Sequence, residues 1–283
     1  MINNFIQIAT NYSFMGRAVL AAVLVGSIAG AIGTFIILRG LSLMGDAISH
    51  AVIPGVAISQ VMGISHFIGA SIFGILASFA IGFISEKSKL KKDAIIGIVF
   101  SSFFALGIIL ISRIRTTTDL HSVLFGNVLT VSNNDIILTS IVGVILLLFI
   151  VLFYKELLIT SFDETLAKVY GFKTKTIHYL FLSMLTLVIV TSLQVVGAIL
   201  IVAMIIAPAA TGYLLTNRLH IMLLLSTTIG AIGAIIGMFF SLTFNFPSGA
   251  SIVLTLSSIF TLTLLFSPKR GLIYQIKFKI NQK

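Results

Sequence analysis

The chain has 283 residues, of which 58% are hydrophobic and only 9% are charged, and its formal net charge is +10. Soluble globular domains carry roughly 25% charged residues, and so few charges cannot cover the surface of a soluble protein of this length. The composition therefore excludes a cytosolic enzyme and a disordered chain. It predicts an all-α fold, that of a polytopic helical membrane protein.

Nine apolar runs are long enough to cross a bilayer, which takes about 20 helical residues. In chain order they are Met15–Leu38, Leu41–Met62, Phe67–Ser85, Ala94–Ser112, Ile136–Tyr154, Ile177–Leu193, Val195–Leu215, Ile221–Leu242 and Ser248–Phe266. The second run contains Asp46, His50 and Pro54, which are unusual within a span. We therefore predict eight to nine transmembrane helices.

The basic residues predict the orientation of the chain. One set of alternate gaps between the runs holds 15 of the 18 Lys and Arg residues, and the other set holds only Arg17, Arg113 and Arg115. Cytoplasmic loops carry an excess of Lys and Arg, so we expect the N-terminus outside and the C-terminus in the cytoplasm. This alternation also accounts for the positive charge without nucleic acid, which would require a solvated basic face.

We expect residues 1–283 to form a single transmembrane domain that ends in a short basic cytoplasmic tail, 267–283. Two longer segments between the spans are expected to lie outside the membrane. The external stretch Arg113–Asn134 is predicted to be a loop with a short amphipathic piece at Val123–Leu129. Two segments rich in small residues, Gly26–Gly33 and Ile229–Gly237, are typical of close helix packing in membranes.

The other segment is cytoplasmic, residues 155–176, and is predicted to contain a short amphipathic helix. Ser161 or Asp163 is a candidate N-cap, Glu164 lies in the first turn, and Gly171 marks the C-terminal end. Such a helix between two spans either docks a partner or lies on the lipid headgroups. The residues alone leave both interpretations open.

Pro208 is predicted to interrupt the seventh run, where Gly197 and Gly212 flank it. A proline removes a backbone donor and leaves a carbonyl that neighbours or a wet cavity must satisfy. Such a break either lines a transport pathway or only kinks the helix, and the residues leave both interpretations open.

The second run contains an ionisable pair, Asp46 and His50, in the segment GLSLMGDAISHAVIPG. A spacing of four places both side chains on one helix face, about 6 Å apart along the axis. An ionisable residue at depth costs about 2.5–3.5 kcal/mol on insertion scales, so a wet or charged environment is expected beside it. Three interpretations stay open: a hydrogen bond that fixes helix packing, a proton relay, and a divalent-cation site.

A carboxylate oxygen and a neutral imidazole nitrogen suit Mn²⁺, Zn²⁺ or Fe²⁺ better than Ca²⁺ or Mg²⁺. One chain supplies only two such ligands here, but two copies about a two-fold axis would supply the pair twice. The other histidines are weaker candidates, and Asp119 with His121 is a minor candidate for metal entry; these histidines are His66, His121, His178 and His220.

Motifs for hydrolysis and for nucleotide binding are absent from the sequence. There is no GxxxxGK[ST], no HExxH and no GxSxG, so we expect neither an enzyme nor a cofactor bound by this chain. Cys is also absent, which excludes a disulfide framework and a thiolate metal site.

At the Asp46–His50 segment the sequence resembles a known family. Arg17–Ala57 is similar to the opening of the permease subunit of bacterial manganese/zinc/iron ABC importers, the ABC-3 type. The resemblance continues in order through Asp119–Ser132, Ser161–Phe172, Gln194–Leu215 and Phe246–Gly271. It therefore covers nearly the whole chain.

The resemblance implies a fold like that of the type II ABC importers, in a bacterial cell membrane. It implies a homodimer of permeases, two copies of a cytoplasmic ATP-binding subunit that hydrolyse ATP, and an extracytoplasmic metal-binding protein. Asp46 and His50 match the family's metal-path residues. The segment Ser161–Gly171 matches the coupling helix that docks on the ATPase, and its candidate contact residues are Phe162, Asp163, Ala167 and Gly171.

The sequence thus predicts the permease subunit of an ATP-driven importer for a divalent transition metal. Mn²⁺ is the first candidate, and Zn²⁺ and Fe²⁺ are alternatives, because Asp and His ligands permit all three. The competing hypothesis is a proton-coupled secondary transporter that works without an ATPase and uses Asp46 and His50 as a relay. Membrane lipids are expected to surround the chain, and nucleic acid is not expected to bind it.

Overall fold

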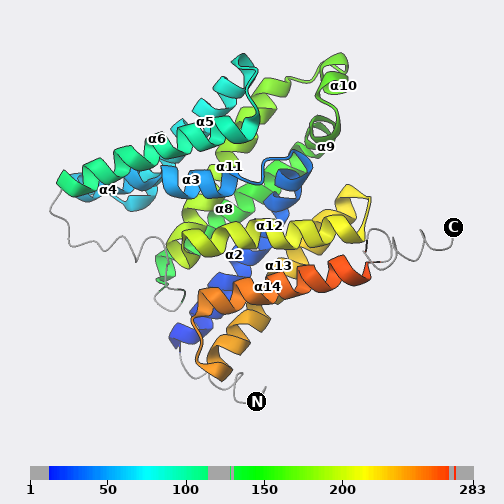
Figure 1. Cartoon of the computed structure of the whole chain (residues 1–283). Coiled ribbons are helices and arrows are strands. Elements are labelled where there is room, and N and C mark those ends of the chain that lie inside the picture. Colours follow the sequence, from blue (N-terminus) through cyan, green and yellow to red (C-terminus); the bar gives the residue numbers. More distant parts are fainter. Residues whose placement is uncertain (1–12, 114–127, 129–130, 268–270, 272–283) are drawn as a thin grey trace. The chain divides into compact units, whose positions relative to one another are not determined.

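The structure, a computed structural model, describes residues 13–113, 128, 131–267 and 271. Within these ranges the regular secondary structure is helical, without strands (Figure 1). The helices are α2 (Ser13–Leu38), α3 (Met44–Ala51), α4 (Ile53–Met62), α5 (His66–Lys87), α6 (Lys92–Arg113), α8 (Asn133–Leu152), α9 (Tyr154–Phe162), α10 (Glu164–Val169), α11 (Thr174–Val196), α12 (Ala198–Leu215), α13 (Leu219–Phe244) and α14 (Ser248–Phe266). The all-α, polytopic fold class is confirmed.

Seven of these helices are long and apolar enough to cross a membrane, namely α2, α5, α6, α8, α11, α13 and α14. They correspond to seven of the nine predicted runs. The seventh run, Val195–Leu215, forms the shorter apolar helix α12, which begins after Gly197. Gly197 has φ +85°, a left-handed conformation that glycine adopts at little cost, and it separates α11 from α12.

The second run differs from a single continuous span. It forms two short helices, α3 and α4, which meet at Val52. Pro54 lies in the first turn of α4, where a missing N–H is tolerated, but it cannot donate a hydrogen bond back into α3. This lost donor explains the division of the run at Val52.

The predicted interruption at Pro208 is wrong. Pro208 lies inside α12, which continues on both sides of it. A proline removes only its own hydrogen bond, and the remaining bonds of the 18-residue helix carry the backbone through the position.

The described helices divide into two compact units. The first contains α2, the first turns of α8, most of α12, and α13 and α14. Here α2 packs on α13 at glycines: a Cβ at Gly26 would collide with the Gly230 carbonyl, and one at Gly30 would collide with the Ser226 carbonyl. The two segments rich in small residues therefore pack against each other, which confirms that they are packing segments.

The second unit contains α3 to α6, the rest of α8, and α9 to α11. Gly55 of α4 and Gly69 of α5 bring their backbones into direct contact, and Gly74 of α5 accommodates Thr186 of α11. Both α3 and α4 also contact α5 and α6, and α3 contacts α11, so that the helix carrying Asp46 and His50 is supported from several sides.

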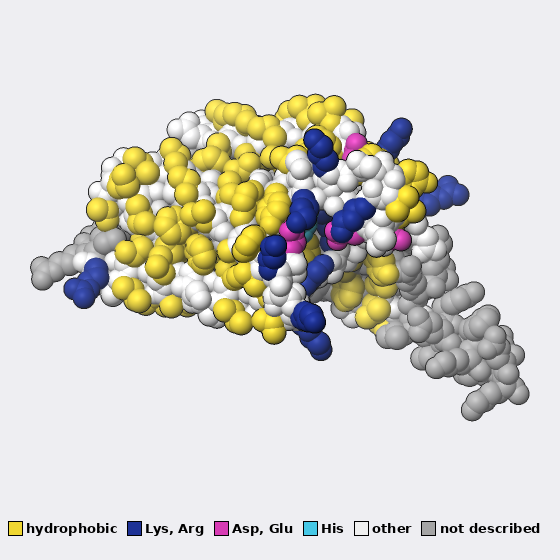
Figure 2. Space-filling model, turned by 90° about the horizontal axis from the view of Figure 1, so that it is seen from above, with side chains coloured by type: hydrophobic (Ala, Val, Ile, Leu, Met, Phe, Trp, Pro, Cys, Tyr) yellow, Lys and Arg dark blue, Asp and Glu magenta, His cyan; other side chains and the backbone are white. Residues whose placement is uncertain are grey.

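Hydrophobic side chains cover most of the face shown in Figure 2, while Lys, Arg, Asp and Glu gather mainly toward one end of it. In the second unit, four lysines lie in and beside the turn between α5 and α6, namely Lys87, Lys89, Lys91 and Lys92. An apolar belt with charges at its margin is what a bilayer requires of the surface that contacts it.

Candidate functional site

The short helix α3 presents Asp46 and His50 on its exposed side. Its other side is buried through Met44, Ala47 and Ile48. The Asp46 side chain is 52% exposed and the His50 side chain 21% exposed, and 3.4 Å separates Asp46 Oδ1 from His50 Nε2. The predicted juxtaposition on one helix face is therefore present, and both side chains are partly exposed.

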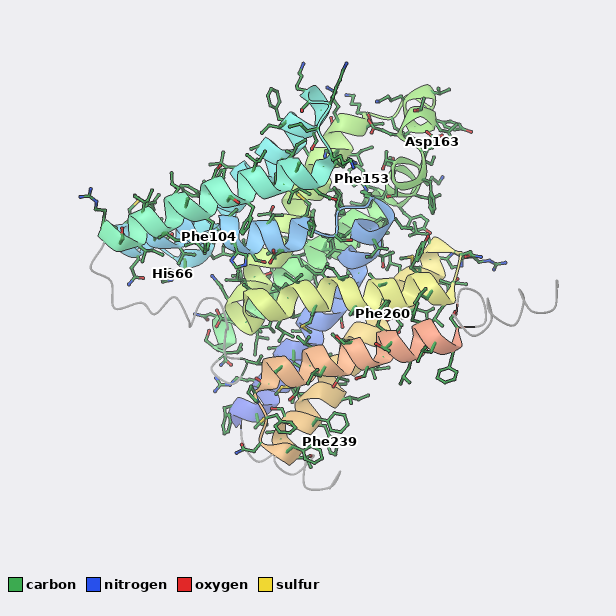
Figure 3. The ribbon with its side chains drawn as sticks, viewed as in Figure 1. His66, Phe104, Phe153, Asp163, Phe239 and Phe260 are labelled. Carbon is green, nitrogen blue, oxygen red and sulfur yellow. The ribbon has the colours of Figure 1, made fainter. Side chains whose placement is uncertain are left out.

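Two phenylalanines of α6 pack beside the His50 ring. The ring centroid of Phe100 lies 5.4 Å and that of Phe104 lies 5.6 Å from the imidazole centroid, with interplanar angles of 55° and 83°. Phe104 is labelled in Figure 3, where α6 passes α3 and α4. On the other edge of the imidazole, Nδ1 is buried and has no hydrogen-bond partner among the described residues. Sequence reasoning missed both phenylalanines, because their spacing of four indicates only that they share a face of α6 and not which helix that face contacts.

A carboxylate oxygen and an imidazole nitrogen can bind a divalent transition metal or exchange a proton. In the described part of the chain, no group of three or more His, Cys, Asp or Glu side chains is arranged to hold a metal ion. The nearby Ser49 hydroxyl donates to the Gly45 carbonyl at 2.7 Å. An ion at this pair would therefore have two strong ligands from one chain, which suits transient binding better than a permanent structural site.

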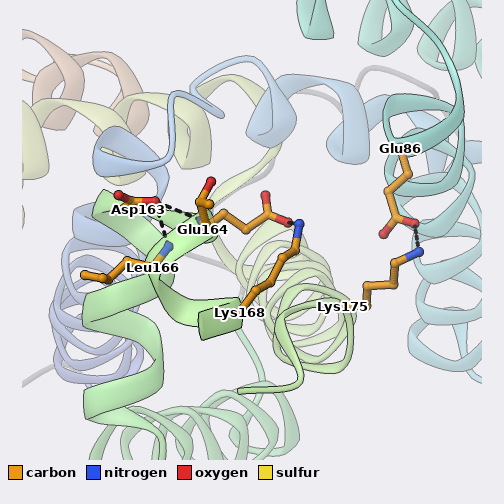
Figure 4. Close-up of polar contacts among 7 residues, drawn as sticks. Glu86, Asp163, Glu164, Leu166, Lys168 and Lys175 are labelled. Carbon is orange, nitrogen blue, oxygen red and sulfur yellow. Dashed lines mark hydrogen bonds and ion pairs between the residues drawn. The ribbon is translucent and has the colours of Figure 1, made fainter. Parts of the chain in front are cut away.

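Residues 155–176, which the sequence predicts to be a cytoplasmic segment, lie in α9, α10 and the start of α11. Asp163 is the N-cap of α10, because its Oδ1 accepts hydrogen bonds from the backbone N–H groups of Thr165 and Leu166 at 2.8 and 3.0 Å (Figure 4). The other candidate cap, Ser161, instead donates its hydroxyl to the Leu157 carbonyl. Gly171 follows α10 and has φ +80°, the left-handed conformation with which a glycine commonly ends a helix.

The surface of this segment combines an internal ion pair with exposed apolar groups. Lys168 Nζ lies 2.8 Å from Glu164 Oε1, and its hydrogen bond lowers the pKa of the Glu164 carboxyl while partial burial opposes this change. Ala167 is fully buried against the protein. The outward side exposes apolar or aromatic groups at Phe162, Leu166, Val169 and Tyr170. Such a mixture suits a protein contact.

A second ion pair ties the base of this segment to the neighbouring hairpin. Lys175 Nζ, in the first turn of α11, lies 2.8 Å from Glu86 Oε2 at the end of α5 (Figure 4). Glu86 directly precedes the α5–α6 turn and its lysines. The pair links the start of α11 to the helices that support α3.

The remaining candidate histidines do not join the Asp46–His50 pair. His66, labelled in Figure 3, is exposed at the α4–α5 turn, with its Nε2 2.7 Å from Gln60 Oε1. His178 lies in α11, where its ring contacts that of Tyr179, and His220 lies in the first turn of α13. Asp119 and His121 lie outside the described residues, as does the predicted amphipathic piece at Val123–Leu129 except for Val128. The basic tail 267–283 is likewise outside them apart from Ser267 and Gly271.

Comparisons with known proteins agree over nearly the full length of the chain. Residues 11–267 match the model of the ABC 3 transport family. The chain is 54% identical to the manganese transport system membrane protein MntC of Listeria monocytogenes over 276 residues, covering 98% of this chain and 99% of that protein. It is 52% identical to the manganese import system permease protein ScaB of Streptococcus gordonii over 270 residues, covering 95% and 97%.

A solved structure shows the same architecture. The structure of PsaBC from Streptococcus pneumoniae in complex with Fab contains a chain that is 51% identical to this one, with a TM-score of 0.86. The match covers 95% of this chain and 98% of that chain.

Proposed function

Because the chain belongs to the ABC 3 transport family, we propose that it is the membrane permease subunit of an ATP-driven importer for a divalent transition metal. Mn²⁺ is the first candidate substrate, since two relatives that are 54% and 52% identical are named as manganese transport proteins. Zn²⁺ and Fe²⁺ are alternatives, because the same ligand types accept them. The observation that carries this proposal is the accessible Asp46–His50 pair on α3.

Asp46 and His50 have different roles in the proposed transfer step. The Asp46 carboxylate attracts the cation electrostatically, and the His50 imidazole selects for metals that accept nitrogen ligands. Two chains in a homodimer would contribute two such pairs around one ion at the two-fold axis. Separating the pairs would then weaken binding and release the metal, as transport requires.

The driving force comes from partner subunits in this proposal. Two copies of a cytoplasmic ATP-binding subunit hydrolyse ATP and dock on the segment around α10. Phe162, Asp163 and Gly171 shape the contact, and the buried Ala167 holds α10 against the rest of its own chain. The exposed apolar groups and the Asp163 cap support this assignment. An extracytoplasmic metal-binding protein delivers the ion, the N-terminus is outside, and the C-terminus is in the cytoplasm.

The decisive experiment measures ⁵⁴Mn²⁺ uptake by proteoliposomes containing the permease and its ATP-binding subunit, with the metal-binding protein supplied outside. We expect Asp46→Asn and His50→Ala to reduce uptake at least tenfold, while both variants still assemble with the ATPase. Asp93→Asn and His66→Ala are matched controls, because these residues are exposed at helix starts away from the pair, and we expect them to transport normally.

Three outcomes would contradict parts of the proposal. Normal uptake by Asp46→Asn or His50→Ala would remove the pair from the metal's path. Uptake by the purified permease alone, driven by a pH gradient without ATP, would establish the proton-coupled transporter instead. Uptake of Zn²⁺ or Fe²⁺ that outcompetes Mn²⁺ at equal concentration would reassign the substrate.

A further inference from the structure

The orientation of the His50 ring is not explained by a hydrogen bond at Nδ1. A histidine that binds a metal through one nitrogen almost always donates the other N–H to a carboxylate, a carbonyl or water. Here Nε2 is directed toward Asp46, but Nδ1 is buried and lacks a hydrogen-bond partner in the part of the chain that the structure describes. Apart from its contact with Asp46 through Nε2, the ring is therefore held in place by packing.

The packing comes from one stripe of α6. Phe100, Phe104 and Gly107 follow the i, i+4, i+7 spacing that lies on a single helix face. At Gly107, an added Cβ would lie only 2.8 Å from Ile53 Cγ2 and 3.1 Å from Pro54 Cδ. The absence of a side chain thus lets α6 approach the α3–α4 junction closely. That approach places the two phenylalanine rings beside His50, at 5.4 and 5.6 Å between centroids.

The two rings also support each other. Their centroids are 5.8 Å apart with an interplanar angle of 30°, and tilted and edge-to-face contacts at these separations are favourable for aromatic groups. Phe103, on the adjacent side of α6, makes a different contact: its ring lies 6.3 Å from that of Phe73 on α5. The face of α6 that carries Phe100 and Phe104 therefore contacts His50, and the side that carries Phe103 does not.

We propose that Phe100 and Phe104 are positioning residues for His50, an aromatic bracket that holds the imidazole with Nε2 turned toward Asp46 and the metal's path. This inference rests on the proposed function of the Asp46–His50 pair. The bracket fixes the orientation of the imidazole ring without a hydrogen bond at Nδ1. Since hydrogen-bonded partners raise the basicity of a metal-binding histidine, a histidine held by rings is a weaker ligand, which favours release of the ion after capture.

The test replaces both rings with leucine, Phe100→Leu with Phe104→Leu, in the assembled permease–ATPase complex in proteoliposomes. Leucine keeps an apolar side chain but cannot make ring contacts. We expect the KM for Mn²⁺ uptake to rise about tenfold, the lower end of the effect of losing a supporting partner of a metal ligand. The Vmax should stay within about twofold, because ATP hydrolysis on the partner drives the later steps. Mn²⁺ binding by the purified complex, followed by electron paramagnetic resonance, should weaken by the same factor as KM rises.

Two further variants separate positioning from general packing. The Phe100→Tyr, Phe104→Tyr pair keeps both rings, so we expect KM and Mn²⁺ affinity close to those of the unmodified protein. Phe103→Leu removes a ring of the same helix that does not contact His50, and we expect no change in KM.

Several results would overturn the bracket. These are an unchanged KM in the leucine pair, an equal rise in Phe103→Leu, a loss of Vmax alone, or a tyrosine pair that behaves like the leucine pair. If the leucine pair does not assemble, the single variant Phe104→Leu takes its place, and an unchanged Mn²⁺ affinity there overturns the inference. Failure of the proposed function has a different signature, since His50→Ala would then still transport Mn²⁺.

Discussion

Substituting Gly26 with alanine should destabilise the protein, although alanine is the better helix residue. Gly26 lies in α2, where an added Cβ would collide with the carbonyl group of Gly230 in α13. The approach is reciprocal, because a Cβ at Gly230 would collide with the carbonyl of Gly26. Both obstacles are backbone atoms, so no side-chain rotation can relieve the overlap. The two helices must therefore move apart.

The expected magnitude follows from two opposing effects. Alanine is favoured over glycine in a helix by about 1 kcal/mol, while overpacking a well-packed interface costs about 1–3 kcal/mol. A gap of about 0.5–1 Å forfeits a quarter to a half of the dispersion energy of each contact that it opens. We therefore expect the overpacking cost of a backbone clash to lie at the upper end of the range of about 1–3 kcal/mol. We therefore expect Gly26→Ala to lose about 2 kcal/mol of unfolding free energy.

Gly97 offers a matched control. It is also a glycine within an apolar helix, α6, but a Cβ there would meet no atom within 4 Å. Gly97→Ala should therefore gain about 0.5–1 kcal/mol from helix propensity alone. In a chain of this size, 1 kcal/mol corresponds to about 2–4 °C in Tm.

The assay is thermal unfolding of the purified permease in detergent, followed by the fraction that stays monodisperse after heating. We expect Gly26→Ala to lower Tm by about 4–8 °C and Gly97→Ala to raise it by about 1–4 °C. A Gly26→Ala variant as stable as the unmodified protein would refute the argument that direct backbone contact between α2 and α13 holds the first unit together.

Two further predictions concern the segment around α10. Asp163→Ala should cost about 1 kcal/mol of local stability through loss of the N-cap, whereas Asp163→Asn should largely retain the cap. Metal-stimulated ATPase activity of the complex should therefore fall in the alanine variant. Equal activity in the two variants would contradict a role for the cap. The Glu164–Lys168 ion pair is exposed and should contribute at most about 0.3–0.5 kcal/mol, measured by a double-mutant cycle of Glu164→Gln and Lys168→Met in thermal unfolding. Lys168 lowers the pKa of Glu164 in the folded protein. The stability that the ion pair contributes is therefore present above the pKa of Glu164 in the unfolded chain, about 4.3, and is lost as pH falls through the lower pKa of the folded protein. A coupling energy between the two residues that persists at pH 2 would contradict this reasoning.

Local features of the structure could be predicted from the sequence. The long apolar runs indicated the membrane helices, because a helix that satisfies its own backbone hydrogen bonds is needed wherever water is absent. The four-residue spacing of Asp46 and His50 predicted their common face, and Asp163 followed by Glu164 predicted a capped helix. Each of these signals depends on atoms within one or two turns of the chain.

The arrangements between distant segments depended on the tertiary structure. The sequence predicted that the glycine-rich segments pack closely, but only the structure showed that Gly26 faces Gly230 and that Gly107 brings α6 onto the α3–α4 junction. A helix that is apolar on all sides carries no polar face to show which side packs and which contacts lipid. For the same reason, the two rings beside His50 could not be assigned from the sequence. The chain alone determined the helices and the polar pair, and side-chain fit between distant helices decided how that pair is held.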